Sequence, residues 1–201
     1  MKKVALFLLM AVALKGFAQQ HQSYYNETLG WEINLPDGFT QAGATESQRG
    51  QAQGMAAFKN AYETDVALSD AEQAGNPLIL YKNGTALFEA RLQEAAGDAD
   101  ETREEGFRFE AHLMEETFKR QAPDARIMQV ASSENIGGIE FLKTTFLITL
   151  PGNKQFFSQS FSGVVNGKDL RINLVYNNGA DGEKMLDALR HSDFNSRKYK
   201  L

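Results

Sequence analysis

The chain has 201 residues, a formal net charge of −5 and no cysteine. The lack of cysteine excludes disulfides, thiolate catalysis and cysteine-ligated zinc, so the fold has to be stabilised without covalent cross-links. An acidic chain without a basic run argues against nucleic acid as a partner.

The first 18 residues have the three parts of a secretory signal peptide. Lys2 and Lys3 form a basic start, residues 4–14 form a short apolar core, and Ala18 ends a small-residue cleavage site. The apolar run is shorter than the about 20 residues that span a bilayer, so we expect cleavage after Ala18 and no membrane insertion afterwards. Because the leader is of bacterial type, we expect export to the periplasm or the extracellular space. Residues 19–201 are then predicted to form a single domain.

The mature chain opens with a short predicted strand that carries the only tryptophan. Trp31, Ile33 and Leu35 alternate with polar residues, and the turn-forming residues 36–38 end the run. Residues 40–74 have no clear periodicity, so we assign no element boundaries there. A hairpin is predicted at residues 78–92, because Asn83 and Gly84 both accept the left-handed backbone conformation of a two-residue turn.

An amphipathic helix is predicted after an acidic polar loop at residues 95–105. Phe107, Ala111, Met114 and Phe118 lie at i, i+4, i+7 and i+11, which is one stripe of an α-helix. The helix is expected to end before Pro123, since proline cannot continue it. A strand over residues 126–131 follows.

Residues 139–176 are predicted to form three consecutive antiparallel strands, the scaffold of the domain. Turn residues 151–153 and the pair Asn166-Gly167 separate the strands. We expect the apolar residues of the three strands to share one continuous face, and the serines at 158, 160 and 162 to face outward. A last helix, capped by Asp181, and the closing residue Phe194 complete the predicted core.

No catalytic, cofactor-binding or metal-ligating residues are predicted. The alternating oxygen ligands of residues 98–104 resemble a calcium loop, but Arg103 stands where that loop needs glycine and Phe109 where it needs glutamate. The three histidines, at 21, 112 and 191, have no metal-ligand spacing, and no G-x-S-x-G motif is present.

Phe109 and Leu113 are the predicted site residues, as a possible partner surface. Both lie off the apolar stripe of the helix, so a helix lying flat on the sheet cannot bury them. Either residues 55–62 pack over them, or they are exposed and bind a partner or ligand.

The two ends of the mature chain resemble PsbP-like domains. Residues 25–39 are similar to the opening strand and proline-glycine-aromatic turn of that family, and residues 168–194 are similar to its last strand, final helix and closing phenylalanine. The resemblance implies an α+β fold, an α/β/α sandwich with a central antiparallel sheet covered by helices. It also implies a non-enzymatic extrinsic subunit or binding factor, with no catalytic set to carry over.

Three functions remain open at this point. We expect an exported, non-enzymatic binding or accessory protein without a cofactor, whose partner is an unidentified protein or a small apolar ligand. One alternative is a small hydrolase whose carboxylates, from residues 98–105 with Glu140 or Asp181, meet only in three dimensions. The other is a carrier of a small apolar ligand, which requires an apolar cavity of several hundred cubic ångströms beside the sheet.

Overall fold

A computed structural model describes residues 22–42, 77–93 and 100–195. The predicted signal peptide at 1–18, the unassigned residues 43–74, the proposed cover at 55–62 and Asp98 lie outside these ranges. The elements in chain order are β1 (Ser23–Asn26), β2 (Trp31–Asn34), β3 (Thr40–Gln41), β4 (Ile79–Asn83), β5 (Ala86–Gln93), α3 (Asp100–Gln121), β6 (Arg126–Ile136), β7 (Ile139–Leu150), β8 (Lys154–Val165), β9 (Lys168–Tyr176) and α4 (Gly179–Arg190).

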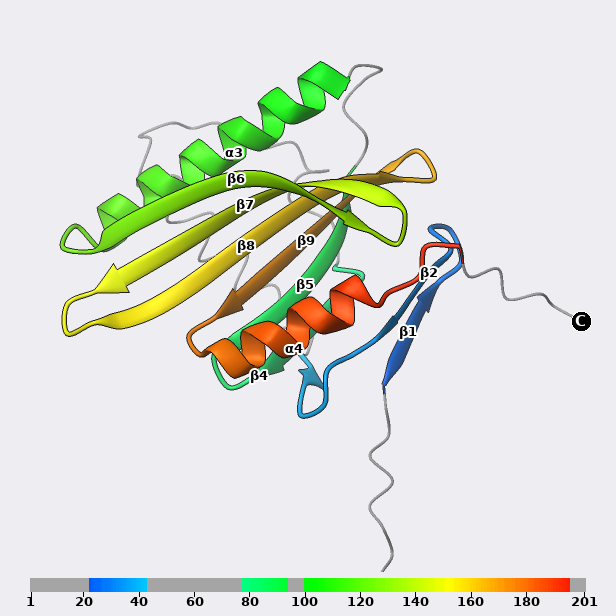
Figure 1. The fold of residues 1–201 in the computed structure, drawn as a ribbon, viewed down its shortest axis with the longest axis horizontal. Coiled ribbons are helices and arrows are strands. Elements are labelled where there is room, and N and C mark those ends of the chain that lie inside the picture. Colours follow the sequence, from blue (N-terminus) through cyan, green and yellow to red (C-terminus); the bar gives the residue numbers. More distant parts are fainter. Residues whose placement is uncertain (1–21, 43–76, 94–99, 196–201) are drawn as a thin grey trace, which may run out of the picture.

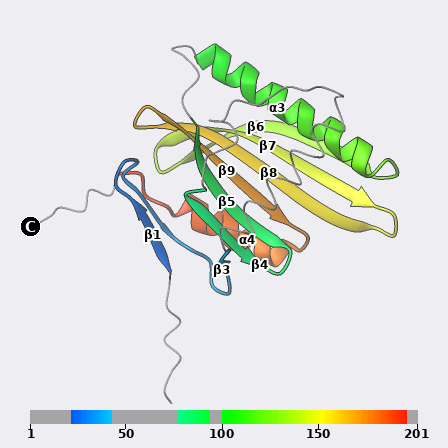
Figure 2. The same cartoon turned by 180° about the vertical axis from the view of Figure 1, so that it is seen from behind.

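The described residues form a three-layer α+β sandwich. Seven antiparallel strands in the order β3-β4-β5-β9-β8-β7-β6 make the central sheet, and β1 and β2 make a separate hairpin. Helix α3 lies on one face of the large sheet, and α4 with the β1–β2 hairpin lies on the other (Figures 1 and 2). The predicted fold class is therefore confirmed.

The predicted hairpins form, and one of them turns at a different pair of residues. Asn166 and Gly167 both have positive φ, 50° and 74°, as a two-residue turn of this kind requires. In the β4–β5 hairpin, however, Asn83 pairs with Ala86, so the turn residues are Gly84 and Thr85. Only Gly84 has positive φ there, 58°, and a turn with glycine first needs no second left-handed residue.

The apolar residues of β7 and β8 face opposite sides of the sheet, which corrects the prediction of one continuous apolar face. Phe146 of β7 is paired with Ser158 of β8, and Phe161 of β8 with Ile172 of β9. Residues directly opposite in an antiparallel pair point to the same face. Phe146 and the serines therefore face α3, whereas Phe161 and Ile172 face α4.

The serines of β8 are consequently buried, not outward-facing as predicted. Ser158, Ser160 and Ser162 are 5%, 8% and 0% exposed. A sheet covered on both faces has no outward side in its middle strands, so polar alternation there does not indicate solvent exposure.

The two faces carry separate apolar cores. The larger core lies between the sheet, α4 and the β1–β2 hairpin, and the smaller core joins Ala111 of α3 to Phe146 and Ile148 of β7. Phe107 and Ala111 are buried as the stripe predicted, and α3 ends before Pro123. The helix begins earlier than expected, at Asp100, so residues 100–105 are its first turns and not a loop.

The C-terminal residues close the larger core on the N-terminal hairpin. Phe194 is 4% exposed and stacks on Trp31, with the ring centroids 5.8 Å apart and an interplanar angle of 7°. The backbones of Glu32 and Asp193 exchange two hydrogen bonds. The cap of α4 differs from the prediction: Asn178 is the N-cap, and its side chain accepts a hydrogen bond from the backbone N–H of Asp181.

Candidate functional site

A cavity of about 310 Å³ lies between α3 and the sheet. Its walls come from α3 and from four neighbouring strands, β5, β9, β8 and β7. Most of the exposed lining surface is apolar, although polar and charged residues make up half of the lining residues, all on the sheet except Glu110 of α3. The lining residues are Arg91, Phe107, Glu110, Ala111, Leu113, Met114, Thr144, Phe146, Ser160, Phe161, Arg171 and Asn173.

The cavity exists because short polar side chains lie beneath the helix. Thr144, Ser160 and Asn173 form one row across β7, β8 and β9, each directly opposite the next. Ser160 Oγ donates a hydrogen bond to Asn173 Oδ1 at 2.9 Å, so the hydroxyl group and the amide oxygen are hydrogen-bonded to each other. Met114 and Phe118 of α3 pack over the outer part of the sheet, against Phe146 and its neighbours. The side chains of Thr144, Ser160 and Asn173 lie next to that contact and are too short to fill the space under the helix.

A charged network ties α3 to β9 at one end of the cavity. Arg171 donates to Asp169 Oδ2 at 2.9 Å and to Glu110 Oε2 of α3 at 2.6 Å, and its guanidinium lies 5.3 Å from the Phe107 ring centroid. Ser162 Oγ also donates to Asp169 at 3.0 Å. Asp169 is only 4% exposed, so this partnered carboxylate is part of the structure and not a solvated surface charge.

A second arginine lies directly opposite Arg171. Arg91 of β5 is paired with Arg171 in the ladder, and Arg91 forms an ion pair with Glu89 two residues earlier. Like charges on directly opposed strand residues repel each other. The carboxylates of Glu89, Asp169 and Glu110 offset this repulsion, which leaves the cavity with a polar end where three carboxylates surround two guanidinium groups.

The two predicted site residues have different environments. Phe109 is 62% exposed on the outer side of α3, whereas Leu113 is half-buried and lines the cavity. The proposed cover, residues 55–62, lies outside the described part of the chain. Whether Phe109 binds a partner stays a prediction, and Leu113 belongs to the cavity wall.

Those carboxylates of the hydrolase hypothesis that the structure describes lie on separate elements. Glu104 pairs with Arg108 within α3, and Asp181 contacts Asn178 and Asn83 at the start of α4, on the opposite face of the sheet. Glu140 follows the β6–β7 turn, opposite Asn135. No group of three metal-ligating side chains occurs among the residues that the structure describes.

A further cluster of charges ties α4 to the strands on its own face. Glu134 of β6 accepts hydrogen bonds from Arg190 Nε at 2.6 Å and from Lys143 Nζ at 2.7 Å. Burial favours the neutral carboxyl, but the hydrogen bonds from Arg190 and Lys143 outweigh it and lower the pKa of Glu134. This acid is therefore charged and structural at neutral pH.

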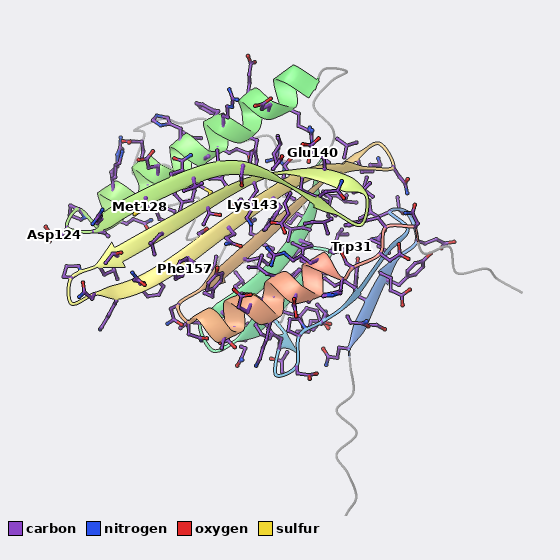
Figure 3. The ribbon with its side chains drawn as sticks, viewed as in Figure 1. Trp31, Asp124, Met128, Glu140, Lys143 and Phe157 are labelled. Atoms are coloured by element: carbon purple, nitrogen blue, oxygen red, sulfur yellow. The ribbon has the colours of Figure 1, made fainter. Side chains whose placement is uncertain are left out.

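Part of the α4 face is left uncovered by that helix. Met128, Leu147, Phe157 and Tyr176 form one row across β6, β7, β8 and β9, and the rings of Phe157 and Tyr176 stack with centroids 5.1 Å apart. Figure 3 shows Met128 and Phe157 on strands beside α4, not beneath it. Met128 is 46% exposed, so the outer end of the row is open to solvent.

The architecture just described, a large antiparallel sheet with a helix on each face, is consistent with the α+β fold of PsbP-like proteins. The solution structure of cyanobacterial PsbP (CyanoP) from Synechocystis sp. PCC 6803 is similar to it, with a TM-score of 0.50 and 11% sequence identity, over 85% of this chain and 90% of that chain. No protein-family model and no curated protein matches the chain. Within residues 22–42, 77–93 and 100–195, no helix has the length and apolarity needed to cross a membrane.

Most of the cavity-lining residues were not predicted as site residues. Ser160 was interpreted as outward-facing, and Arg91, Arg171 and Asn173 were not singled out from the sequence. The sequence signal for this site was the recurrence of polar residues at alternate positions of consecutive strands. That signal indicates a polar site only when the strand register shows that these positions lie on the same face of the sheet.

Proposed function

We propose that this protein is an exported, non-enzymatic binding protein that holds a small, mainly apolar ligand in the cavity between α3 and the sheet. The observation that carries the proposal is the cavity itself, about 310 Å³ in volume, whose lining surface is mostly apolar. Ligand sites in proteins have volumes of about 300 to 1,000 Å³ and combine an apolar lining with a few placed polar groups. Export is supported by the predicted signal peptide.

The distribution of polar groups favours a ligand with one polar end. Ser160, Asn173 and Arg171 lie on the sheet side of the cavity, whereas the helix side is lined by apolar residues such as Met114 and Ala111, with Glu110 beside Arg171 as its polar residue. A ligand that fits both walls has an apolar body and a hydrogen-bonding group directed at β8 and β9. The body then gains free energy from burial, and the polar group fixes its orientation.

The proposal can be tested with N-phenyl-1-naphthylamine, an uncharged apolar probe that fluoresces more strongly in apolar surroundings. We expect saturable binding to the purified protein, weakened about tenfold or more by Ser160→Leu, because the leucine side chain would occupy the cavity. Val164→Leu lies on the same strand outside the lining and serves as the matched control. Near-ultraviolet circular dichroism checks that both variants are folded.

A second candidate function rests on Phe109, which is 62% exposed on α3. If this residue forms part of a partner surface, Phe109→Ala reduces probe binding while Ser160→Leu leaves it unchanged. Loss of binding in Ser160→Leu alone favours the cavity. The absence of any saturable binding to the folded protein would contradict the ligand-binding proposal.

A further inference from the structure

Among the described residues, strand β6 is a long edge of the main sheet that lacks four of the common protections against pairing. The other edge, β3, has only two residues, whereas β6 has eleven and contains neither proline nor lysine. Its pairing with β7 is continuous from Arg126–Thr149 to Ile136–Ile139, without a bulge. Natural proteins protect edges with short strands, proline, lysine or bulges, because an open edge invites another strand. The first of these devices protects β3, and none of the four protects β6.

The open hydrogen-bonding groups of β6 can be assigned from its turn. Gly137 and Gly138 both have positive φ, so Ile136 and Ile139 close the hairpin as a hydrogen-bonded pair. Even-numbered residues of β6 therefore bond to β7, and the odd-numbered residues from 127 to 135 direct their backbone N–H and C=O groups outward. No residue of the described chain bonds to these outward groups.

The edge is accessible from both faces of the sheet. Residues 128–133 are all exposed, although their side chains alternate between the α3 face and the α4 face. Helix α3 therefore does not overhang this part of β6. Val130 is 56% exposed and Met128 is 46% exposed, which places apolar surface next to unpaired backbone.

We infer that β6 pairs with β6 of a second copy of this chain, antiparallel, around a twofold axis at Val130. The odd-numbered residues must then pair with each other, so Gln129 bonds to Ala131 of the second copy and Ile127 to Ser133. The even-numbered residues form the closely spaced, non-hydrogen-bonded pairs. The two sheets join into one, with both α3 helices on the same face.

Side-chain complementarity selects this register over its neighbours. Centred on Val130, the strand places Arg126 opposite Glu134 of the second copy, in two symmetric pairs, and Val130 opposite itself. A centre on Gln129 would place Glu134 opposite Asp124, which is a repulsive pair of acids. A centre on Ala131 would place Glu134 opposite the apolar side chain of Met128.

Glu134 can accept the additional cation. Its Oε1 accepts from Arg190 and its Oε2 from Lys143, and each carboxylate oxygen has a second acceptor position. Arg126 is exposed at the start of the same strand. The proposed contact therefore extends an existing charge network across the twofold axis without leaving a charge unpaired.

Sedimentation velocity of the purified protein over a concentration series tests the association. We expect a dimer, and Val130→Lys should raise its dissociation constant about tenfold or more, because two ammonium groups would meet at the axis. Val164→Lys is the matched control, since Val164 is also an exposed strand valine but lies on β8 away from the edge. A protein that is monomeric throughout, or a dimer that Val130→Lys leaves intact, would overturn the inference.

Cysteine cross-linking tests the register independently of any loss of folding. The chain has no cysteine of its own. Val130→Cys should form an intermolecular disulfide on mild oxidation, because the paired Cα atoms would lie about 4.5 Å apart. Ser132→Cys should not, because its own counterpart would lie four residues along the second strand, roughly 13 Å away. Linkage of Ala131→Cys in place of Val130→Cys would refute the register.

Discussion

Replacing Phe194 by alanine should be among the most damaging single changes in the described part of the protein. Phe194 is 4% exposed, stacks on Trp31 and lies 5.7 Å from Phe141, measured between ring centroids. A Cβ added at Gly137 would lie only 2.8 Å from the Phe194 ring, so backbone forms a third wall of the site. Such a site cannot collapse around a smaller side chain, so we expect a loss of about 4 kcal/mol in the free energy of unfolding. That is a large share of the about 5–15 kcal/mol of a typical domain.

Urea unfolding followed by the fluorescence of the only tryptophan measures this loss. Trp31 is fully buried in the native core, so its emission reports the transition directly. Phe109→Ala is the matched control: it removes the same ring from a position that is 62% exposed, and it should change stability by less than about 0.5 kcal/mol. If Phe194→Ala costs less than about 1 kcal/mol, the C-terminal residues do not close the core and the packing argument is wrong.

Two further predictions concern α4 and β6. Gly182→Ala should destabilise by about 1–3 kcal/mol, because its Cβ would lie 2.4 Å from the Tyr176 ring, whereas Gly179→Ala meets nothing within 4 Å and should be neutral or slightly stabilising in thermal unfolding. The lowered pKa of Glu134 means that its contribution to stability is present above the unfolded-state pKa and is lost as the pH falls through the native pKa. Glu134→Gln should therefore reduce stability at neutral pH and flatten the acid side of the stability profile, and an unchanged profile would contradict the assigned network.

The larger elements of the fold were predictable because their signals are local. The two-residue turn at Asn166-Gly167 and the apolar stripe from Phe107 to Phe118 depend only on residues close in the chain. Capping was less predictable, because Asn178 and Asp181 both suit a helix start and only the backbone geometry decides between them. The start of α3 was missed because acidic residues are equally common in polar loops and in first helical turns.

The candidate site was not predictable in the same way. Ser160 and Arg171 come from different strands. The sequence of neither strand indicates that the two side chains lie on the same face of the sheet. The pairing of Ser160 with Asn173 and of Arg171 with Arg91 decides this, and pairing depends on the whole sheet. The cavity also requires α3 to pack at one particular place on that face, which no single segment specifies.

The amino-acid sequence by itself determined that the protein has no cysteine chemistry, the positions of most strands and turns, and the spacing of apolar residues within each element. These properties follow from composition and from periods of 2 and 3.6 residues, which are local. Only the tertiary structure decided that β7 and β8 turn their apolar residues to opposite faces, that the serines of β8 lie beneath a helix, and that β6 is an edge strand of the described sheet. The reason is that register and layer order are set by contacts between segments distant in the chain, where a polar residue can be buried and an apolar residue exposed.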